Sequence, residues 1–262
     1  MTHPFLLGPR PRAFAHRGWH LGELHDLENS LSAFRRAAEE GFRYIETDVH
    51  ATADGVVVVN HDETLERTTD GRGTIRRLPW SAVRTARIGG REPVCSLDAA
   101  LEELPDTFFN IDVKDDSAVE PVLRTLREHN AWDRVCLASF AEHRLSQLRR
   151  AAGPRLLTST GKRSAGLLWL GSKWGGWPLR SLVAGSAAQV PQEFGGLRVI
   201  DRKFVRQAHR WGIEVHVWTV DDPAEMLRLL EAGVDGLVTD RPDVLNDVLR
   251  ERYGDPRSEI GG

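Results

Sequence analysis

The chain has 262 residues, of which 40% are hydrophobic and 28% are charged, and its formal net charge is −3. This length is long for one ordinary domain but normal for an α/β barrel, which needs about 250 residues. Charges of both signs are mixed along the chain, without the basic patch that nucleic-acid binding needs, so a nucleic-acid partner is excluded. No apolar run approaches the ~18 residues of a membrane span.

Compartment is indicated by the N-terminus and the cysteines. The first twelve residues contain only one short apolar stretch and no cleavage-site pattern, so they are not expected to form a secretory signal. Cys95 and Cys136 stand far apart without metal-ligand spacing, and each is predicted to pack as a small hydrophobe. These features favour a cytoplasmic protein.

Short β-rich runs alternate along the chain with helical segments that begin at capping residues. The runs predicted as strands are 13–16, 44–49, 56–60, 108–114, 134–139, 155–158, 187–190, 213–219 and 236–239. Helices are predicted over 30–40 and 118–129, and others begin at Ser96, at a capping box over 139–142, at 222–225 and at 240–243. The run 56–60 follows an Asp-Gly turn, which favours a hairpin with the run before it.

About eight strand–helix units result, which is typical of a parallel α/β sheet. A closed barrel and an open doubly wound sheet share this pattern. Polar residues gather where strands end, and barrel active sites lie at the C-terminal ends of strands, so the barrel is favoured. We therefore predict a single TIM-type (β/α)8 barrel over residues 1–262, with a core at about 12–252, a short insertion after the second strand and a flexible tail at 253–262.

Four segments place ionisable residues at predicted strand ends. These are His16-Arg17-Gly18, the pair Glu46 and Asp48, the pair His61-Asp62, and the set Asn110, Asp112 and Lys114. Residues two apart on a strand point to the same face, so the carboxylates of each strand share one side of the sheet.

Three carboxylates on buried faces need neutralisation, since an unpaired buried charge costs several kcal/mol. A hard divalent cation with oxygen ligands offsets more charge than one lysine does, so Glu46, Asp48 and Asp112 are predicted to hold Mg²⁺ or Ca²⁺. Zinc is less suited, because these strands carry neither cysteine nor paired histidines. The alternative is a structural salt-bridge cluster with Lys114, Arg17 and Arg43.

His16 and His61 are stronger candidates as a pair than singly. A neutral imidazole takes a proton and a charged one gives it at physiological pH. Arg17 adds a permanently charged fork that suits a phosphate. Two histidines, a metal and an Arg/Lys pair are the groups that in-line phosphodiester cleavage requires.

The same residues lie in motifs that closely resemble the glycerophosphodiester phosphodiesterase family. The matching motifs run in order from residue 16 to 243: His16-Arg17-Gly18, Glu28-Asn29-Ser30, Tyr44-Ile45-Glu46-Thr47-Asp48-Val49, Asp54-Gly55, Val58-Val59-Asn60-His61-Asp62, Thr64-Leu65-Glu66-Arg67-Thr68-Thr69, Asn110-Ile111-Asp112-Val113-Lys114, Val217-Trp218-Thr219-Val220 and 233–242. The resemblance implies a TIM-type barrel that hydrolyses glycerophosphodiesters to sn-glycerol 3-phosphate and an alcohol.

The resemblance also implies roles for residues of this chain. It assigns His16 and His61 as catalytic acid and base, and Arg17 and Lys114 as phosphate contacts. It assigns a divalent cation, Ca²⁺ or Mg²⁺, to Glu46, Asp48 and Asp112. The family usually has glutamate at the last position, so Asp112 is one methylene shorter. The segment from His61 to Asp112 is short, and we expect the insertion to be little more than a loop and a helix.

Other residues have two interpretations each. Trp218 is expected at the barrel mouth as a wall for the glycerol carbons, although its neighbours equally suit a core role. Glu28 is expected to hold Arg17 in place. Asn29 and Ser30 are expected to cap the first helix, and Arg67, Thr68 and Thr69 to order a loop.

The segment Leu167–Trp177 is rich in leucine and tryptophan. It is expected to pack on its own barrel, and the alternative is a hydrophobic lip that takes a lipid-like alcohol or contacts a membrane surface. It supports a second hypothesis, a phospholipase D-like or lyase-type enzyme that acts on intact lipids or lysolipids. A third hypothesis, a non-catalytic barrel, is disfavoured because no histidine or carboxylate of the set is missing.

Overall fold

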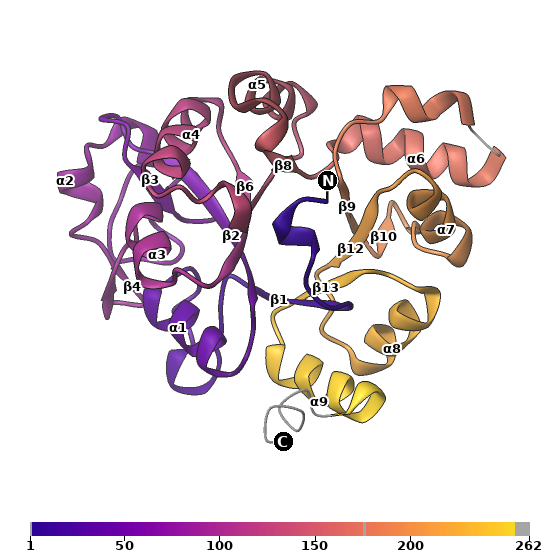
Figure 1. Cartoon of the computed structure of the whole chain (residues 1–262). Coiled ribbons are helices and arrows are strands. Elements are labelled where there is room, and N and C mark those ends of the chain that lie inside the picture. Colours follow the sequence, from indigo (N-terminus) through magenta and orange to yellow (C-terminus); the bar gives the residue numbers. More distant parts are fainter. Residues whose placement is uncertain (1, 175–176, 255–262) are drawn as a thin grey trace.

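The computed structural model describes residues 2–174 and 177–254, and its centre is a ring of eight parallel strands surrounded by helices (Figure 1). The strands are β1 (Arg12–His16), β2 (Tyr44–Ala51), β6 (Phe108–Val113), β7 (Val135–Ala138), β8 (Leu157–Thr158), β9 (Ala187–Pro191), β12 (Glu214–Trp218) and β13 (Gly236–Thr239). The helices that follow them in turn are α1 (Leu31–Glu39), α3 (Leu97–Glu103), α4 (Val119–Glu128), α5 (Glu142–Ala152), α6 (Lys162–Trp174), α7 (Arg202–Arg210), α8 (Pro223–Ala232) and α9 (Pro242–Tyr253).

Strand pairing closes the ring. The strands neighbour one another in the order β8-β7-β6-β2-β1-β13-β12-β9. Between the two ends, a parallel bridge joins Ser159 to Ala187, and the amide of Ser186 donates to the carbonyl of Thr158 at 2.9 Å. The predicted (β/α)8 barrel is therefore confirmed.

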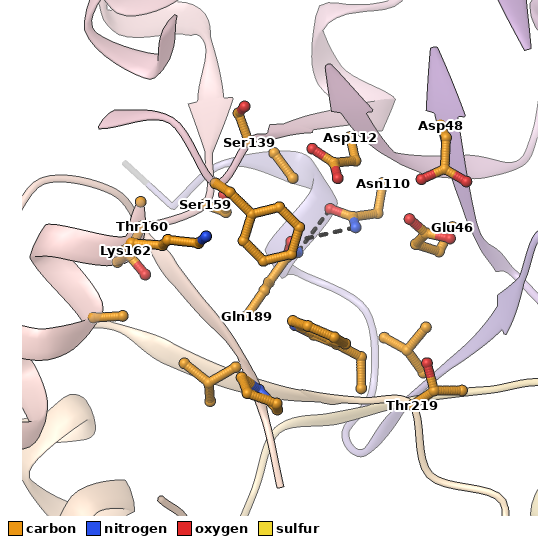
Figure 2. Close-up of a pocket in the computed structure, with 18 of the residues that line it drawn as sticks. Glu46, Asp48, Asn110, Asp112, Ser139, Ser159, Thr160, Lys162, Gln189 and Thr219 are labelled. Carbon is orange, nitrogen blue, oxygen red and sulfur yellow. Dashed lines mark hydrogen bonds between the residues drawn. The ribbon is translucent and has the colours of Figure 1, made fainter. Parts of the chain in front are cut away.

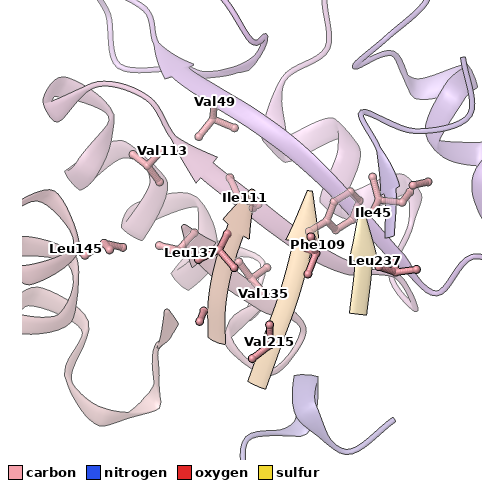
Figure 3. Close-up of a cluster of buried hydrophobic side chains, with 14 of the residues drawn as sticks. Ile45, Val49, Phe109, Ile111, Val113, Val135, Leu137, Leu145, Val215 and Leu237 are labelled. Atoms are coloured by element: carbon pink, nitrogen blue, oxygen red, sulfur yellow. The ribbon is translucent and has the colours of Figure 1, made fainter. Parts of the chain in front are cut away.

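Alternating residues on each strand separate the core from the site. The outward-facing side chains of β2 and β6 pack with the helices in one large cluster, which includes Ile45, Val49, Phe109, Ile111 and Val113 (Figure 3). The residues between them face the barrel interior and are polar: Glu46, Asp48, Asn110 and Asp112. Period-two alternation thus places every carboxylate of these strands inside the ring.

The insertion between β2 and α3 is larger than the expected loop and helix. It pairs β3 (Val57–Val59) with β2 as the predicted hairpin, then adds a 3₁₀ turn η3 (Ile75–Arg77), the short α2 (Trp80–Val83), and the antiparallel pair β4 (Arg87–Ile88) and β5 (Glu92–Pro93). A separate hydrophobic cluster holds it together: Leu27, Val58, Leu65, Ile75, Val83, Ala86, Ile88 and Val94. Elements of two to four residues leave no periodicity in the sequence, which is why the prediction missed them.

Helix starts follow the predicted caps except at α5. Ser30, Ser96 and Asp222 each accept a hydrogen bond from the backbone three residues on. The predicted box at 139–142 is wrong, because α5 begins after Ala141 without a side-chain cap. Ser139 instead donates to the carbonyl of Val113 at 3.0 Å, tying the end of β7 to β6.

The expectation that the leucine- and tryptophan-rich segment packs on its own barrel holds for its described part. α6 buries Leu168 completely and packs Leu167 and Trp169 against the main core, while Leu170 is 39% exposed. Residues 175–176 and the side chains of Trp174 and Trp177 lie outside the described part, as does 255–262 of the predicted tail. Within the described ranges no helix is long and apolar enough to cross a membrane.

Small buried groups fill the interior. Cys95 and Cys136 are free thiols and are buried among hydrophobic residues, as predicted, and burial raises the pKa of Cys95 to about 12. In a third cluster, within the ring, Cys136 packs with Phe14, Tyr44 and Val238, and Phe5 of the N-terminal segment packs against them. Phe5 belongs to the 3₁₀ turn η1 (Pro4–Leu6), which lies over the middle of the barrel in Figure 1.

A buried arginine, Arg12, links several strands at the N-terminal end of the barrel. Arg12, 1% exposed, donates to both carboxylate oxygens of Glu214 at 2.9 Å, to Tyr44 and to the carbonyls of Leu6 and Gly8. Arg10 reaches the same carboxylate at 2.8 Å. Burial by itself would raise the pKa of Glu214, but His216 and Arg12 lower it to about 2. The network joins β1, β2 and β12 beneath the ring.

We expect Glu214→Gln to lower the free energy of unfolding by about 3–5 kcal/mol, because it leaves a buried guanidinium without its counter-charge. The depressed pKa means that this contribution is present above the unfolded-state value of 4.5 and is lost as pH falls toward 2. Urea unfolding at pH 7 and pH 4 measures both effects. Glu103→Gln, which breaks the exposed pair with Arg35, is the control and should cost at most about 1 kcal/mol. Equal stability losses in the two variants would contradict the assignment.

Candidate active site

The C-terminal ends of the strands surround a cavity of ≈ 690 Å³. It brings together all the predicted site residues except Glu28, which lies behind Arg17: the residues that line the cavity are His16, Arg17, Glu46, Asp48, His61, Asp112, Lys114 and Trp218. Figure 2 shows the three carboxylates on one wall and Lys162 on the opposite wall. The convergence predicted from same-face spacing is therefore present.

His16, the last residue of β1, is held from both sides by carboxylates. Its Nδ1 lies 2.6 Å from Asp240 Oδ1, and its Nε2 lies 3.6 Å from Glu46 Oε2. Although burial favours the neutral ring, Glu46 and Asp240 raise the pKa of His16. His20 contacts the same oxygen of Asp240 at 3.2 Å. Asp240 follows β13, which is the strand next to β1.

His61 has a similar arrangement in the insertion. Its Nδ1 lies 2.6 Å from Asp62 Oδ1, and its backbone carbonyl lies 3.2 Å from His50 Nε2. A carboxylate at Nδ1 fixes the ring orientation and turns Nε2 away from the anchor. Both cavity histidines are thus anchored through the same nitrogen by different carboxylates.

The three carboxylates come from adjacent strands and differ in their partners. Asp48 and Asp112 are paired residues across β2 and β6. Burial together with the neighbouring Asp48 raises the pKa of Glu46 to about 8. Burial opposes ionisation of Asp48 as well, but Lys114 and Arg17 hold its pKa below the usual value. Glu46 Oε2 and Asp112 Oδ1 are buried without a hydrogen-bond partner.

Lys114 stands between two of these carboxylates. Its Nζ lies 2.8 Å from Asp48 Oδ1 and 2.7 Å from Asp112 Oδ2. Burial disfavours a charged lysine, yet the two aspartates raise its pKa above the usual value. Over residues 2–174 and 177–254, no three His, Cys, Asp or Glu side chains converge closely enough, as they stand, to hold a metal ion. Arg43, the third cation of the predicted salt-bridge alternative, instead packs over Phe108.

Arg17 is presented by a tight turn after β1. It has a φ of 56°, in the left-handed region, and its backbone is tied to the carbonyl of Glu46 and the amide of Asn29. The next residue, Gly18, has a φ of 86°, and a Cβ there would lie 2.9 Å from Ala33. Glycine is therefore required where the turn meets α1.

A chain of ion pairs connects the carboxylate wall to His61. Arg17 Nε lies 3.4 Å from Asp48, and its Nη1 donates to Glu28 at 2.9 Å. Glu28 thus holds Arg17 in place, as expected. Arg67 then bridges Glu28 at 2.7 Å and Asp62 at 2.6 Å, and the hydrogen bond from Arg67 lowers the pKa of Asp62 to about 2.

One expectation about the residues of this region is corrected. Ser30 caps the first helix, whereas Asn29 donates to Asp48 at 3.3 Å and accepts from Thr47. Arg67 ties its loop to the carboxylates of Glu28 and Asp62, which lie on separate segments.

The rest of the cavity is lined by two side-chain amides at its base and by aromatic rings at its side. Asn110 and Gln189 exchange two hydrogen bonds across the barrel, at 3.3 and 2.7 Å (Figure 2). Trp218 lies at the mouth, as predicted, and its ring meets Phe140 edge-on at 5.5 Å between centroids. The cavity therefore has a charged half and an apolar half.

Comparisons with known proteins agree with this geometry. The model of the glycerophosphoryl diester phosphodiesterase family matches residues 16–244. The probable glycerophosphodiester phosphodiesterase 2 of Mycobacterium tuberculosis is 42% identical over 245 residues, which are 92% of this chain and 91% of that protein. The chain belongs to the glycerophosphoryl diester phosphodiesterase family.

Solved structures show that the family fold is shared. A putative glycerophosphoryl diester phosphodiesterase from Silicibacter pomeroyi superimposes with a TM-score of 0.79 at 22% identity, covering 96% of this chain and 98% of its own. An Oleispira antarctica phosphodiesterase in complex with the product sn-glycerol-3-phosphate has a TM-score of 0.74 at 22% identity, covering 92% and 97%. The resemblance drawn from the motifs is confirmed, and this family member is a phosphoric diester hydrolase.

Sequence reasoning missed several residues of this phosphodiesterase site. Asp240 lies within a matched motif, but nothing in its spacing shows that it reaches His16 across the β1–β13 pair. Gln189, Phe140 and Lys162 lie on segments that carried no motif. The pairing of Arg67 with both Glu28 and Asp62 depends on the folded insertion. Of the two carboxylates that anchor the histidines, Asp62 alone could have been found from the sequence, because it directly follows His61.

We expect Arg67→Gln to lower kcat by roughly tenfold, as the loss of a residue that orients catalytic groups does. Without Arg67 the pKa of Asp62 rises from about 2, so the acidic limb of the pH–rate profile should move to higher pH. Arg67→Lys can pair with only one carboxylate and should restore activity partly. Arg72→Gln, on the exposed loop of the same insertion, is the control. A pH profile identical to that of the unchanged protein would remove Arg67 from this role.

Proposed function

We propose that this chain hydrolyses glycerophosphodiesters to sn-glycerol 3-phosphate and an alcohol, with His16 and His61 as the acid–base pair. The observation that carries the proposal is the matched anchoring of both imidazoles through Nδ1 on one cavity. An Nδ1–H donated to a carboxylate leaves Nε2 to exchange protons with nucleophile and leaving group, and in His16 this atom lies 3.6 Å from Glu46. The product bound to the Oleispira antarctica relative supports the choice of substrate.

The cationic side chains bind the phosphodiester in this proposal. Arg17 offers a planar fork of donors, and Lys114 offers a compact charge between the carboxylates and the cavity. They offset charge that develops on the phosphoryl oxygens. Trp218 forms a wall for the glycerol carbons at the mouth.

A divalent cation, Ca²⁺ or Mg²⁺, completes the proposed site on Glu46, Asp48 and Asp112. The donor set fits, because it consists of carboxylate oxygens, and two of them are buried without partners. When bound, such an ion supplies Lewis-acid stabilisation of phosphoryl charge. Lys114 has to move from between the two aspartates for both to become ligands.

We expect His16→Ala and His61→Ala each to lower kcat by ~10²–10⁴-fold with the fold intact, as loss of a general acid or base does. Release of glycerol 3-phosphate from glycerophosphocholine measures the effect, and circular dichroism checks the fold. His25→Ala is the control, since its ring is 75% exposed and pairs, among the residues that the structure describes, with Asp26 alone. Near-normal turnover in either active-site variant would refute the acid–base assignment. Cleavage of lysophosphatidylcholine alone would favour the lipid-directed alternative, which Trp169 in the cavity wall supports.

We expect EDTA to abolish turnover and Asp112→Asn to weaken cation binding by at least tenfold, with activity partly restored by excess Ca²⁺ or Mg²⁺. Calorimetric titration of the protein with each cation measures affinity independently of turnover. Asp106→Asn, an exposed residue before β6, is the control. Unchanged cation affinity in Asp112→Asn would remove Asp112 from the ligand set.

The remaining parts of the proposal concern location and partners. A cytoplasmic location and the absence of a nucleic-acid partner stay predictions from composition. Contact of Leu167–Trp177 with a membrane surface also stays untested, and the inward packing of Leu168 and Trp169 argues against it.

A further inference from the structure

The cavity extends well beyond the groups that act on the phosphate. A volume of ≈ 690 Å³ is in the range of sites that enclose a drug-sized ligand, whereas glycerol 3-phosphate is much smaller. The part away from the carboxylates is bordered by apolar and aromatic side chains from α6, from the ends of β9 and β12 and from two connecting segments: Phe140, Ala165, Trp169, Val190, Val199 and Trp218. This half has room for the alcohol on the other side of the phosphorus.

One charged side chain lies in this apolar half. Lys162 begins α6, lines the cavity, and holds its Nζ 5.1 Å from the centroid of the Phe140 ring (Figure 2). In residues 2–174 and 177–254 no carboxylate lies within ion-pair distance of its ammonium. The nearby acid, Glu142, is already engaged by Ser164 at 3.1 Å and Arg149 at 3.5 Å. Lys162 is therefore a cation on the cavity wall without a protein counter-charge.

The aromatic ring beneath it already faces two cations. Lys114 Nζ lies 6.0 Å from the same Phe140 centroid, so an ammonium approaches this ring from each of two walls. A lone aromatic ring attracts a quaternary ammonium through its negative face. Here Lys162 already occupies the ring, and a further cation meets repulsion from Lys162, whereas the charge of Lys114 is offset by Asp48 and Asp112. An anionic group meets attraction from Lys162 and no opposing carboxylate in this half.

We propose that Lys162 and Phe140 form the subsite for the departing alcohol, and that this subsite selects an alcohol bearing an anionic group, such as a second phosphate, over choline. The proposal rests on the proposed function, since it concerns the same reaction. The glycerol side is then left to the polar half, where the amides of Asn110 and Gln189 and the carboxylate wall suit hydroxyl groups. The ring of Phe140 packs against the carbon frame of the alcohol, and Trp218, which meets that ring edge-on, lies at the border with the glycerol side.

The test compares three glycerophosphodiesters, with the same cation present throughout. Glycerophosphoinositol and glycerophosphoinositol 4-phosphate differ by one phosphate, and glycerophosphocholine carries the opposite charge. We expect kcat/KM to be highest for the phosphorylated substrate. Lys162→Gln should reduce its advantage over glycerophosphocholine by about fivefold, the size of one exposed ion pair, because Lys162 is itself exposed. Lys162→Glu should reverse the order of the two.

Arg163→Gln provides the matched control, because Arg163 is the next residue, exposed and outside the cavity lining. Its substrate ratios should equal those of the unchanged protein. Binding of the phosphorylated substrate to His61→Ala, followed by tryptophan fluorescence, should weaken by a similar factor when Lys162→Gln is added. This readout separates binding in the subsite from turnover.

The outcomes distinguish failure of the subsite from failure of the proposed function. Substrate ratios that Lys162→Glu leaves unchanged, with hydrolysis intact, would overturn the subsite alone. A preference of the unchanged protein for glycerophosphocholine over the phosphorylated substrate would do the same. Failure to cleave any of the three substrates would contradict the proposed function and the subsite together.

Discussion

The burial of three carboxylates inside a ring of strands is the constraint around which the mouth of this barrel is arranged. Asp48 and Asp112 lie directly opposite each other on neighbouring strands, an arrangement in which like charges repel. Lys114 is inserted between them, and Arg17 approaches from the turn after β1. Glu46 has a raised pKa because it is buried and lies beside Asp48. The site thus combines two aspartates paired with Lys114 and one glutamate whose ion-pair partner is His16, at 3.6 Å.

The insertion belongs to this charge arrangement as much as the barrel does. Its own hydrophobic cluster holds the segment that carries His61, Asp62 and Arg67, and Arg67 returns to the barrel through Glu28. The two histidines therefore depend on different supports. His16 is oriented by a carboxylate of the ring, and His61 by a carboxylate of the insertion. Small movements of the insertion relative to the ring change the distance between the two imidazoles directly.

Much of the fold and of the site was predictable from the sequence. The features that were missed are mainly contacts between segments that lie far apart in the chain. Period-two alternation in β2 and β6 put Glu46, Asp48 and Asp112 on one face, and the motif order was sufficient for the fold. Contacts made by long side chains between distant segments were not predictable, as with Asp240 on His16 or Arg67 between Glu28 and Asp62. The capping box at 139–142 failed because Ser139 had a better acceptor on the neighbouring strand. Lys162 had no motif to mark it, and only the folded cavity shows where it lies.

The opposite end of the barrel has a consequence for how the chain acquires its fold. Arg12 on the first strand and its partner Glu214 are separated by 202 residues, and β1 also pairs with the last strand, β13. During synthesis the arginine emerges 202 residues before its partner and stays in water until the segment with Glu214 has left the ribosome. Loop-closure entropy makes such distant contacts slow to form. The barrel therefore closes late in folding. Until β13 has been synthesised, one edge of β1 has no partner strand.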